Sequence, residues 1–199
     1  MTKRIGLWGR PSVFIFLAVA LIVMVWALFG GPPPREGEEV RIGVPIILSD
    51  QYGHRGGGDA VTGKFLLVTF GYTFCPDVCP TILRDMSLAV DLLGEESEKV
   101  VPAFVTIDPE RDTAERLKEY AASFHPRLLV FTGTPEEIAK IAKGFRVYYA
   151  RSKADTGGDD YLMDHTALIY LMAPDGSYIT NFFYGTTPEN MMMVMEQHL

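Results

Sequence analysis

The two cysteines of the chain have three residues between them, in Cys75-Pro-Asp-Val-Cys79. They follow a continuous apolar run and come directly before a helical pattern, so we expect them where a strand ends and a helix begins. The free N–H groups and the dipole of a helix N-terminus stabilise a thiolate. We therefore expect Cys75 to be unusually acidic, and we expect the pair either to chelate one metal ion or to close a disulfide.

A histidine supplies a third donor of the right type. His165, in Tyr161-Leu-Met-Asp-His-Thr166, lies between a polar segment and a predicted strand, where its ring can face the cysteine loop. Two thiolates and one imidazole satisfy Cu(I), a soft ion that needs no fourth ligand. The same set leaves one position open on a tetrahedral Zn²⁺ ion. The donor types favour copper and leave zinc open.

Other residues with suitable side chains are weaker candidates. His54, His125 and His198 are expected at surface or cap positions. The methionines between residues 191 and 195 offer soft thioethers, but they fall on a predicted terminal helix, where methionine more commonly fills a core. We expect them to pack rather than to bind copper.

One acidic residue and one segment with acidic residues lie near the predicted site. Asp77, between the cysteines, disfavours thiolates by like charge but favours a bound cation or a basic partner. Asp108-Pro-Glu-Arg-Asp-Thr113 follows a predicted strand, and we interpret it as a capped turn that leads into a helix rather than as part of the site.

The elements that position these residues alternate between strand and helix patterns. Asp112 with Glu115, and Thr134 with Pro135 and Glu137, are typical helix starts, and Gly144 is typical of a helix end. A turn at Pro174-Asp-Gly176 indicates a hairpin. The predicted strands cover 65–71, 100–106, 128–132, 146–150, 167–171 and 177–183, and the predicted helices cover 80–93 and begin at 112, 134 and 188, with a polar loop over 151–160. This order predicts an α/β fold, a thioredoxin-like sandwich with a central mixed sheet flanked by helices.

The N-terminal segment reads as a membrane anchor. Residues 11–30 are uncharged and mostly apolar, close to the length that spans a bilayer. Basic residues precede them, which predicts that residues 1–10 stay in the cytoplasm. The residues that end the apolar run, Phe29 to Pro34, lack an A-x-A cleavage pattern, which favours a retained anchor over a cleaved signal peptide. Residues 31–40 are expected to be a stiff linker, and 41–199 the thioredoxin-like copper-binding domain.

The part of the chain after Pro34 is strongly acidic. All 25 acidic residues of the chain follow residue 34, together with 15 of its 18 basic ones. Such a domain repels nucleic acid, and its charge keeps it soluble.

Three motifs, Gly71-Tyr-Thr-Phe-Cys-Pro-Asp-Val-Cys-Pro80, Asp108-Pro-Glu-Arg-Asp-Thr113 and Asp164-His-Thr166, resemble those of the Sco (SenC) copper chaperone family, in the same order. The resemblance implies that Cys75, Cys79 and His165 bind copper, as Cu(I) and also as Cu(II). It implies that the domain serves the dinuclear copper centre of cytochrome c oxidase subunit II during assembly.

The same resemblance implies a location and partners. The protein is expected as a single-pass protein of the bacterial inner membrane, with its C-terminal domain on the periplasmic face. Partners are subunit II, other periplasmic copper chaperones and thiol reductants, and Cys75 and Cys79 form the redox-active pair in any thiol-disulfide exchange.

Other functions remain open from the sequence. The main alternative is a thiol-disulfide oxidoreductase without a physiological metal, although such enzymes usually have two residues between their cysteines and a cis-proline opposite them. A third alternative is a peroxidase of the peroxiredoxin or glutathione peroxidase type, but the motifs that surround the reactive cysteine of those enzymes are absent here. An inert structural disulfide, common in exported proteins, would stabilise little over so short a loop.

Overall fold

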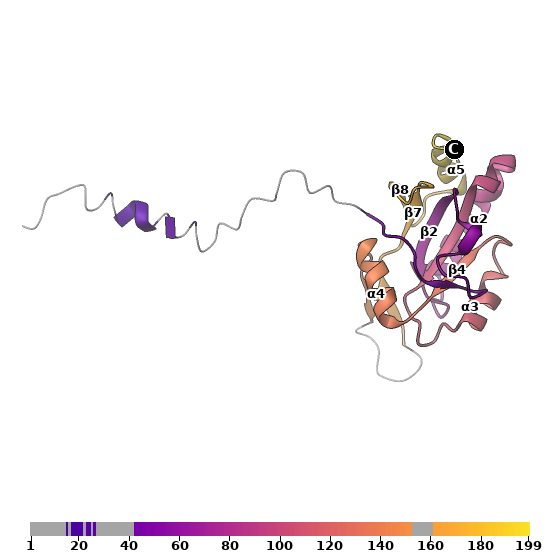
Figure 1. Ribbon diagram of the computed structural model, residues 1–199, viewed down its shortest axis with the longest axis horizontal. Helices are drawn as coiled ribbons and strands as arrows, with labels where there is room; N and C mark the ends of the chain where they lie inside the picture. Colours follow the sequence, from indigo (N-terminus) through magenta and orange to yellow (C-terminus); the bar gives the residue numbers. More distant parts are fainter. Residues whose placement is uncertain (1–14, 16, 22, 25, 27–41, 153–160) are drawn as a thin grey trace, which may run out of the picture. The chain divides into compact units, whose positions relative to one another are not determined.

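The computed structural model describes residues 15, 17–21, 23–24, 26, 42–152 and 161–199 (Figure 1). The chain divides into two compact units, Met1–Val40 and Arg41–Leu199. In the first unit the described residues are helical with exposed side chains. Among all described residues, no helix is both long and apolar enough to cross a membrane. The rest of the predicted anchor, the segment 1–10 and the linker 31–40 lie outside the described residues, as do positions 153–160 of the predicted loop.

The second unit is built on a six-stranded mixed sheet in the order β1-β4-β3-β2-β7-β8. The central strand β2 pairs in parallel with β3 and antiparallel with β7. Two predicted strands, 65–71 and 100–106, are confirmed with the predicted bounds, and the predicted hairpin is confirmed as β7 and β8. The strands are β1 (Ser49–Asp50), β2 (Phe65–Gly71), β3 (Val100–Thr106), β4 (Leu129–Thr132), β7 (Leu168–Met172) and β8 (Tyr178–Phe183).

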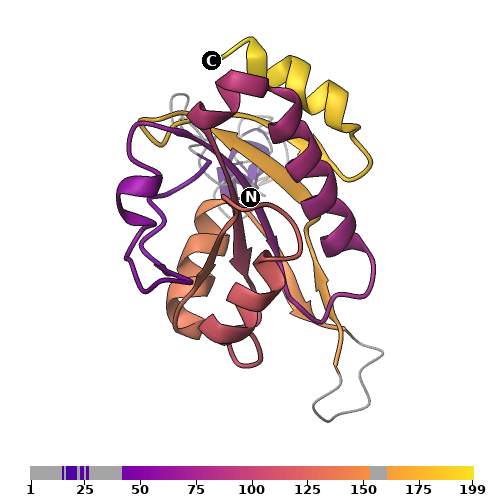
Figure 2. The same ribbon diagram turned by 90° about the vertical axis from the view of Figure 1, so that its right-hand side faces the viewer.

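Helices cover both faces of this sheet. Side chains of β2 alternate between the two faces, as a strand requires: Leu67 packs in the cluster that includes α2 and α5, whereas Val68 and Phe70 pack in the cluster that includes α4. Figure 2 shows α2 and α5 side by side, with α4 on the other side of the sheet. The helices are η1 (Gly58–Ala60), α2 (Val78–Leu92), η2 (Gly94–Lys99), α3 (Ala114–Ala121), α4 (Pro135–Gly144) and α5 (Pro188–Glu196).

Two predicted helix starts differ in outcome. Thr134 forms a full capping box with Glu137, and Pro135 is the first residue of α4, as predicted. The prediction that Asp112 begins α3 is wrong by one residue, because Thr113 is the N-cap and accepts a hydrogen bond from the Arg116 N–H. The Asp112 carboxylate is instead buried inside the fold.

Helix α2 begins two residues before the predicted start. Cys79 therefore lies in its first turn, and Cys75 lies in the turn that precedes it. Pro80 is tolerated because the first helical residues have no intrahelical partner for their N–H groups.

A short hairpin outside the main sheet was not predicted. Strands β5 (Tyr149–Arg151) and β6 (Met163–His165) pair antiparallel with each other and form a separate two-stranded sheet. The predicted strand 146–150 is thus wrong in its bounds, since Arg146 has a positive φ of 57° that no strand accommodates.

Candidate metal centre

The structure brings Cys75, Cys79 and His165 together. One ligand atom of each lies within 4.8 Å of the others. The Cys79 Sγ is 3.5 Å from the His165 Nε2, and the Cys79 N–H donates to the Cys75 Sγ at 3.4 Å. The cysteines come from the β2–α2 connection and the histidine from β6, so the fold joins two segments that are far apart in the chain.

A glycine makes room for the buried sulfur. Gly71 is the last residue of β2, and a Cβ atom there would lie 2.6 Å from the Cys79 Sγ and 2.8 Å from the Phe104 ring. Both distances are far shorter than a van der Waals contact. Cys79 therefore packs directly on the backbone of the central strand, which only glycine permits at this position.

The two thiols have opposite acidities. The pKa of Cys75 falls to about 4, because the Cys79 thiol, the His165 ring and the backbone N–H groups of Cys79 and Asp77 bond to its thiolate and outweigh the effect of partial burial. The pKa of Cys79 is raised, because its thiol bonds to the Cys75 thiolate and its side chain is buried. The pair therefore holds one thiolate and one thiol at neutral pH.

The His165 ring is oriented by contacts on two sides. Its Nδ1 lies 3.1 Å from the Thr166 carbonyl oxygen, and since that oxygen only accepts, Nδ1 carries a proton in this contact. Nε2 is then the ring nitrogen that faces the Cys79 Sγ. The edge of Tyr72 packs on the imidazole with ring centroids 6.0 Å apart. A proton on Nδ1 leaves Nε2 as the ring nitrogen that can bind a metal.

The Asp108–Thr113 turn does more than cap a helix. The Asp112 carboxylate accepts hydrogen bonds from the Thr73 N–H (3.0 Å), the Thr73 hydroxyl (2.5 Å) and the Thr106 hydroxyl (2.6 Å). Burial raises the pKa of Asp112, although the bonds from Thr106 and Thr73 oppose the shift. Thr73 stands two residues before Cys75, so this turn holds the cysteine loop, contrary to the interpretation from sequence.

The remaining histidines lie away from the site. Within the described part of the chain, Cys75, Cys79 and His165 form the one group of metal-ligating side chains close enough to share an ion. His54 and His198 are exposed, as predicted. Of the surface and cap positions expected for His125, the surface position is wrong, because the residue is buried; its Nδ1 accepts a hydrogen bond from the Arg127 backbone N–H.

The other sequence candidates also have defined places. Asp77 is exposed within the cysteine loop. Met191 and Met195 are fully buried in the core between α5 and α2, which confirms the packing prediction for these two, whereas Met193 is half exposed.

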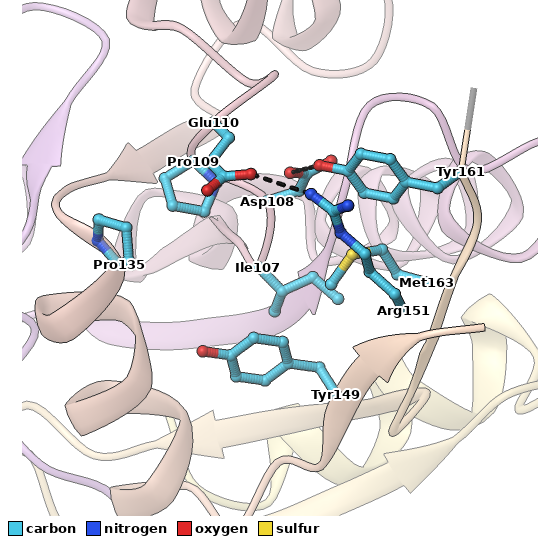
Figure 3. A pocket seen from close by; sticks show the side chains of 9 residues that line it. All are labelled: Ile107, Asp108, Pro109, Glu110, Pro135, Tyr149, Arg151, Tyr161 and Met163. Atoms are coloured by element: carbon cyan, nitrogen blue, oxygen red, sulfur yellow. Dashed lines mark hydrogen bonds and ion pairs between the residues drawn. The ribbon is translucent and has the colours of Figure 1, made fainter. Parts of the chain in front are cut away.

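A pocket of about 150 Å³ lies beside the hairpin (Figure 3). Tyr149 pairs with His165 and Arg151 with Met163, so these four side chains share one face of the hairpin. Three of them line the pocket. Its lining residues are Ile107, Asp108, Pro109, Glu110, Pro135, Tyr149, Arg151, Tyr161 and Met163.

Comparisons with known proteins relate this chain to one family. The family model SCO1/SenC matches residues 34–199. A SCO2-like protein of Rickettsia conorii is 38% identical over 190 residues, which cover 89% of this chain and 93% of that protein. The family match therefore covers the whole second unit of the chain.

Solved structures agree. The structure of Bradyrhizobium japonicum ScoI with copper bound is 42% identical with a TM-score of 0.70, and the match covers 79% of this chain and 99% of that one. BsSco, described as a member of the Sco family of cytochrome c oxidase assembly proteins with a disulfide switch, is 24% identical with a TM-score of 0.60, over 80% of this chain and 93% of that one. At that identity the likeness concerns the fold, which is thioredoxin-like as predicted.

Proposed function

Because the chain belongs to the SCO1/SenC family, we propose that it binds copper through Cys75, Cys79 and His165 and delivers it to the dinuclear copper centre of cytochrome c oxidase subunit II during assembly. One observation carries the proposal: two sulfurs and one imidazole nitrogen lie within 4.8 Å of one another. A relative with bound copper supports it: the solved structure of B. japonicum ScoI, which is 42% identical to this chain, has copper bound.

The donor set fits copper by its chemistry. Thiolates are soft ligands that select Cu(I), and an imidazole is an acceptable third donor that also suits Cu(II). Bound copper would be a cargo held between the cysteine loop and β6. The Cys75 thiolate needs no deprotonation near neutral pH, whereas Cys79 must release its proton when the metal binds.

Thiol-disulfide exchange is a second activity of the same two sulfurs. The Cys75 thiolate attacks an oxidised disulfide of a partner and forms a mixed disulfide; Cys79 then loses its proton and closes the Cys75–Cys79 bond. Each step releases one partner sulfur as a thiolate, and the two sulfurs take up the Cys79 proton and one proton from solvent. Two electrons therefore pass to the partner. Subunit II or other periplasmic copper chaperones suit the role of the partner that is reduced, and a thiol reductant suits the role of the partner that restores the two thiols of this chain. The low pKa of Cys75 keeps the attacking sulfur as a thiolate at neutral pH.

The N-terminal segment completes the proposal. Residues 11–30 would anchor the protein in the bacterial inner membrane, with 1–10 in the cytoplasm and 41–199 on the periplasmic face after the linker 31–40. The supporting observation is the placement of Lys3, Arg4 and Arg10 before the uncharged apolar run.

Copper titration tests the proposal directly. The reduced full-length chain, purified in detergent, is titrated against a Cu(I) chelator, and we expect one ion per chain. Cys75→Ser, Cys79→Ser and His165→Ala should each weaken binding by about tenfold or more, because three-coordinate Cu(I) has no spare ligand.

Matched controls come from the same chain. His198→Ala removes an exposed histidine away from the site, and Met193→Leu removes an exposed thioether of α5. Both should bind copper as tightly as the wild type. Full affinity in His165→Ala, or a loss in Met193→Leu, would contradict the assignment of ligands.

A further inference from the structure

The metal centre joins two parts of the fold that no sheet connects. Cys75 and Cys79 follow β2 in the six-stranded sheet, whereas His165 lies on β6 of the separate hairpin. Ladder hydrogen bonds order the hairpin internally but leave its distance from the cysteines undetermined. Since a metal site tolerates only about 0.5 Å of misplacement, other contacts must set that distance.

Arg111 spans the gap between the two parts. Its side chain is 12% exposed, and its Nε donates to the Asp108 Oδ2 at 2.5 Å. Its Nη1 donates to the Tyr161 carbonyl oxygen at 2.9 Å. The Tyr161 hydroxyl closes the ring of contacts, since it donates to the Asp108 Oδ1 at 2.6 Å (Figure 3). The turn after β3 is thus tied to the segment that leads into β6.

The same guanidinium is stacked between two aromatic rings. Its central carbon lies 3.5 Å from the centroid of Tyr161 and 4.4 Å from that of Phe74. Phe74 directly precedes Cys75, and Tyr161 stands four residues before His165. The guanidinium groups of Arg116 and Arg151 also lie over these rings, 4.6 Å from the centroid of Phe74 and 3.9 Å from that of Tyr161. The stack therefore runs from the cysteine loop to the histidine segment, with Arg111 at its centre.

Asp112 and Arg111 hold different sides of the site. Asp112 bonds to Thr73 and Thr106 and so fixes the cysteine loop to the main sheet. Arg111 bonds through its Nη1 to the backbone carbonyl of Tyr161, on the histidine side. A lysine at position 111 would keep the charge beside Asp108 but would lose the planar fork that bonds and stacks at once.

We propose that Arg111 is a positioning residue of the metal centre, which sets the place of His165 against the cysteine pair and affects copper binding through His165. The inference rests on the proposed function for its copper readout. It adds a residue outside the ligand set, and it assigns the Arg111–Tyr161 contact a role in binding rather than in folding alone.

A double-mutant cycle tests this. Cu(I) affinity is measured by chelator competition for the full-length reduced wild type, Arg111→Lys, His165→Ala and the double variant. We expect Arg111→Lys to weaken binding by about tenfold in the wild-type background. In the His165→Ala background it should change binding by less than about twofold, because its effect passes through the missing ring.

Arg116→Lys is the matched control. It also loses a stack on Phe74, but it lies on α3 and is not part of the Arg111–Tyr161 contact. Its Cu(I) affinity should equal that of the wild type. Equal weakening by Arg111→Lys in both backgrounds, or no weakening in either, overturns the proposal. If Arg111→Lys unfolds in thermal melts, Tyr161→Phe, which removes only the hydroxyl bond to Asp108, replaces it in the cycle with the same expected non-additivity.

A metal-free readout separates this inference from the proposed function. In histidine-labelled NMR spectra of the reduced chain, the His165 ring signals carry the ring-current shift of Tyr72. Arg111→Lys should move them toward the signals of the exposed His54 and His198, and Arg116→Lys should leave them in place. Unmoved His165 signals in Arg111→Lys refute the positioning role whatever the copper result, whereas a wild type that binds no Cu(I) refutes the proposed function alone.

Discussion

At the scale of single residues, the unequal environments of the two cysteines divide the chemistry between them. Cys75 is partly exposed and holds the thiolate, whereas Cys79 is 2% exposed and keeps its proton against the backbone of Gly71. An incoming partner therefore meets Cys75 first. The buried sulfur follows as the second ligand or as the resolving thiol.

This division predicts selective alkylation. Because the pKa of Cys75 is lowered to about 4, its thiolate fraction should stay near one from about pH 6 to about pH 8, where that of an ordinary cysteine with a pKa of about 8.5 rises roughly tenfold per unit. Peptide mass spectrometry of the metal-free reduced chain at about pH 6 should find iodoacetamide on Cys75 while Cys79 stays unmodified. Cys75→Ser, the control, should remain unmodified until denaturant is added. Rapid modification of Cys79 in the folded wild type would contradict the structure.

At the scale of the elements, the turn between β3 and α3 connects several segments around the site. Thr113 caps the helix, Asp112 bonds to Thr73 of the cysteine loop and to Thr106 of the strand, and Arg111 reaches the histidine segment. Two successive side chains of one turn, Arg111 and Asp112, therefore contact the two segments that build the site, and the third, Thr113, starts the next helix.

Two variants of Asp112 should separate its bonds from its charge. Asp112→Ala leaves three donors without an acceptor, the buried Thr106 hydroxyl and the two partly buried donors of Thr73, and should lower the free energy of unfolding by about 3 kcal/mol. Asp112→Asn keeps one oxygen for Thr106 and for the Thr73 N–H, and its amide can donate to the Thr73 hydroxyl, so its cost should be about 1 kcal/mol or less. Urea denaturation measures both. Equal destabilisation by the two variants would mean that the negative charge, rather than the bonding pattern, holds the loop.

Some of these elements could be predicted from the sequence and others could not. Strand β2 was predictable because it is buried on both faces and reads as one apolar run, and α4 because its cap, first proline and final glycine all agree. The β5–β6 hairpin was not, since strands of three residues show no period. The three ligands could be named from residue type and motif. The roles of Asp112 and Arg111 could not, because their partners lie up to 50 residues away along the chain.

At the scale of the whole molecule, the proposal requires the second unit to lie outside the cytoplasm. An alkaline phosphatase fused after Leu199 should be active, because the basic residues before position 11 keep the N-terminus inside. A β-galactosidase fused at the same place is the control and should be inactive. The reverse pattern would remove both the proposed topology and the periplasmic partners.

The two-stranded sheet that carries His165 has a consequence for how copper leaves. An isolated hairpin is marginally stable, so its amides should exchange with deuterium far faster than those of the central strand. Copper would crosslink this labile part to the rigid one. Exchange should therefore slow at 163–165 and 149–151 when Cu(I) binds and stay unchanged in β2, and His165→Ala should abolish the slowing. If hairpin opening is the first step of release, the copper dissociation rate cannot exceed the rate at which these few amides open.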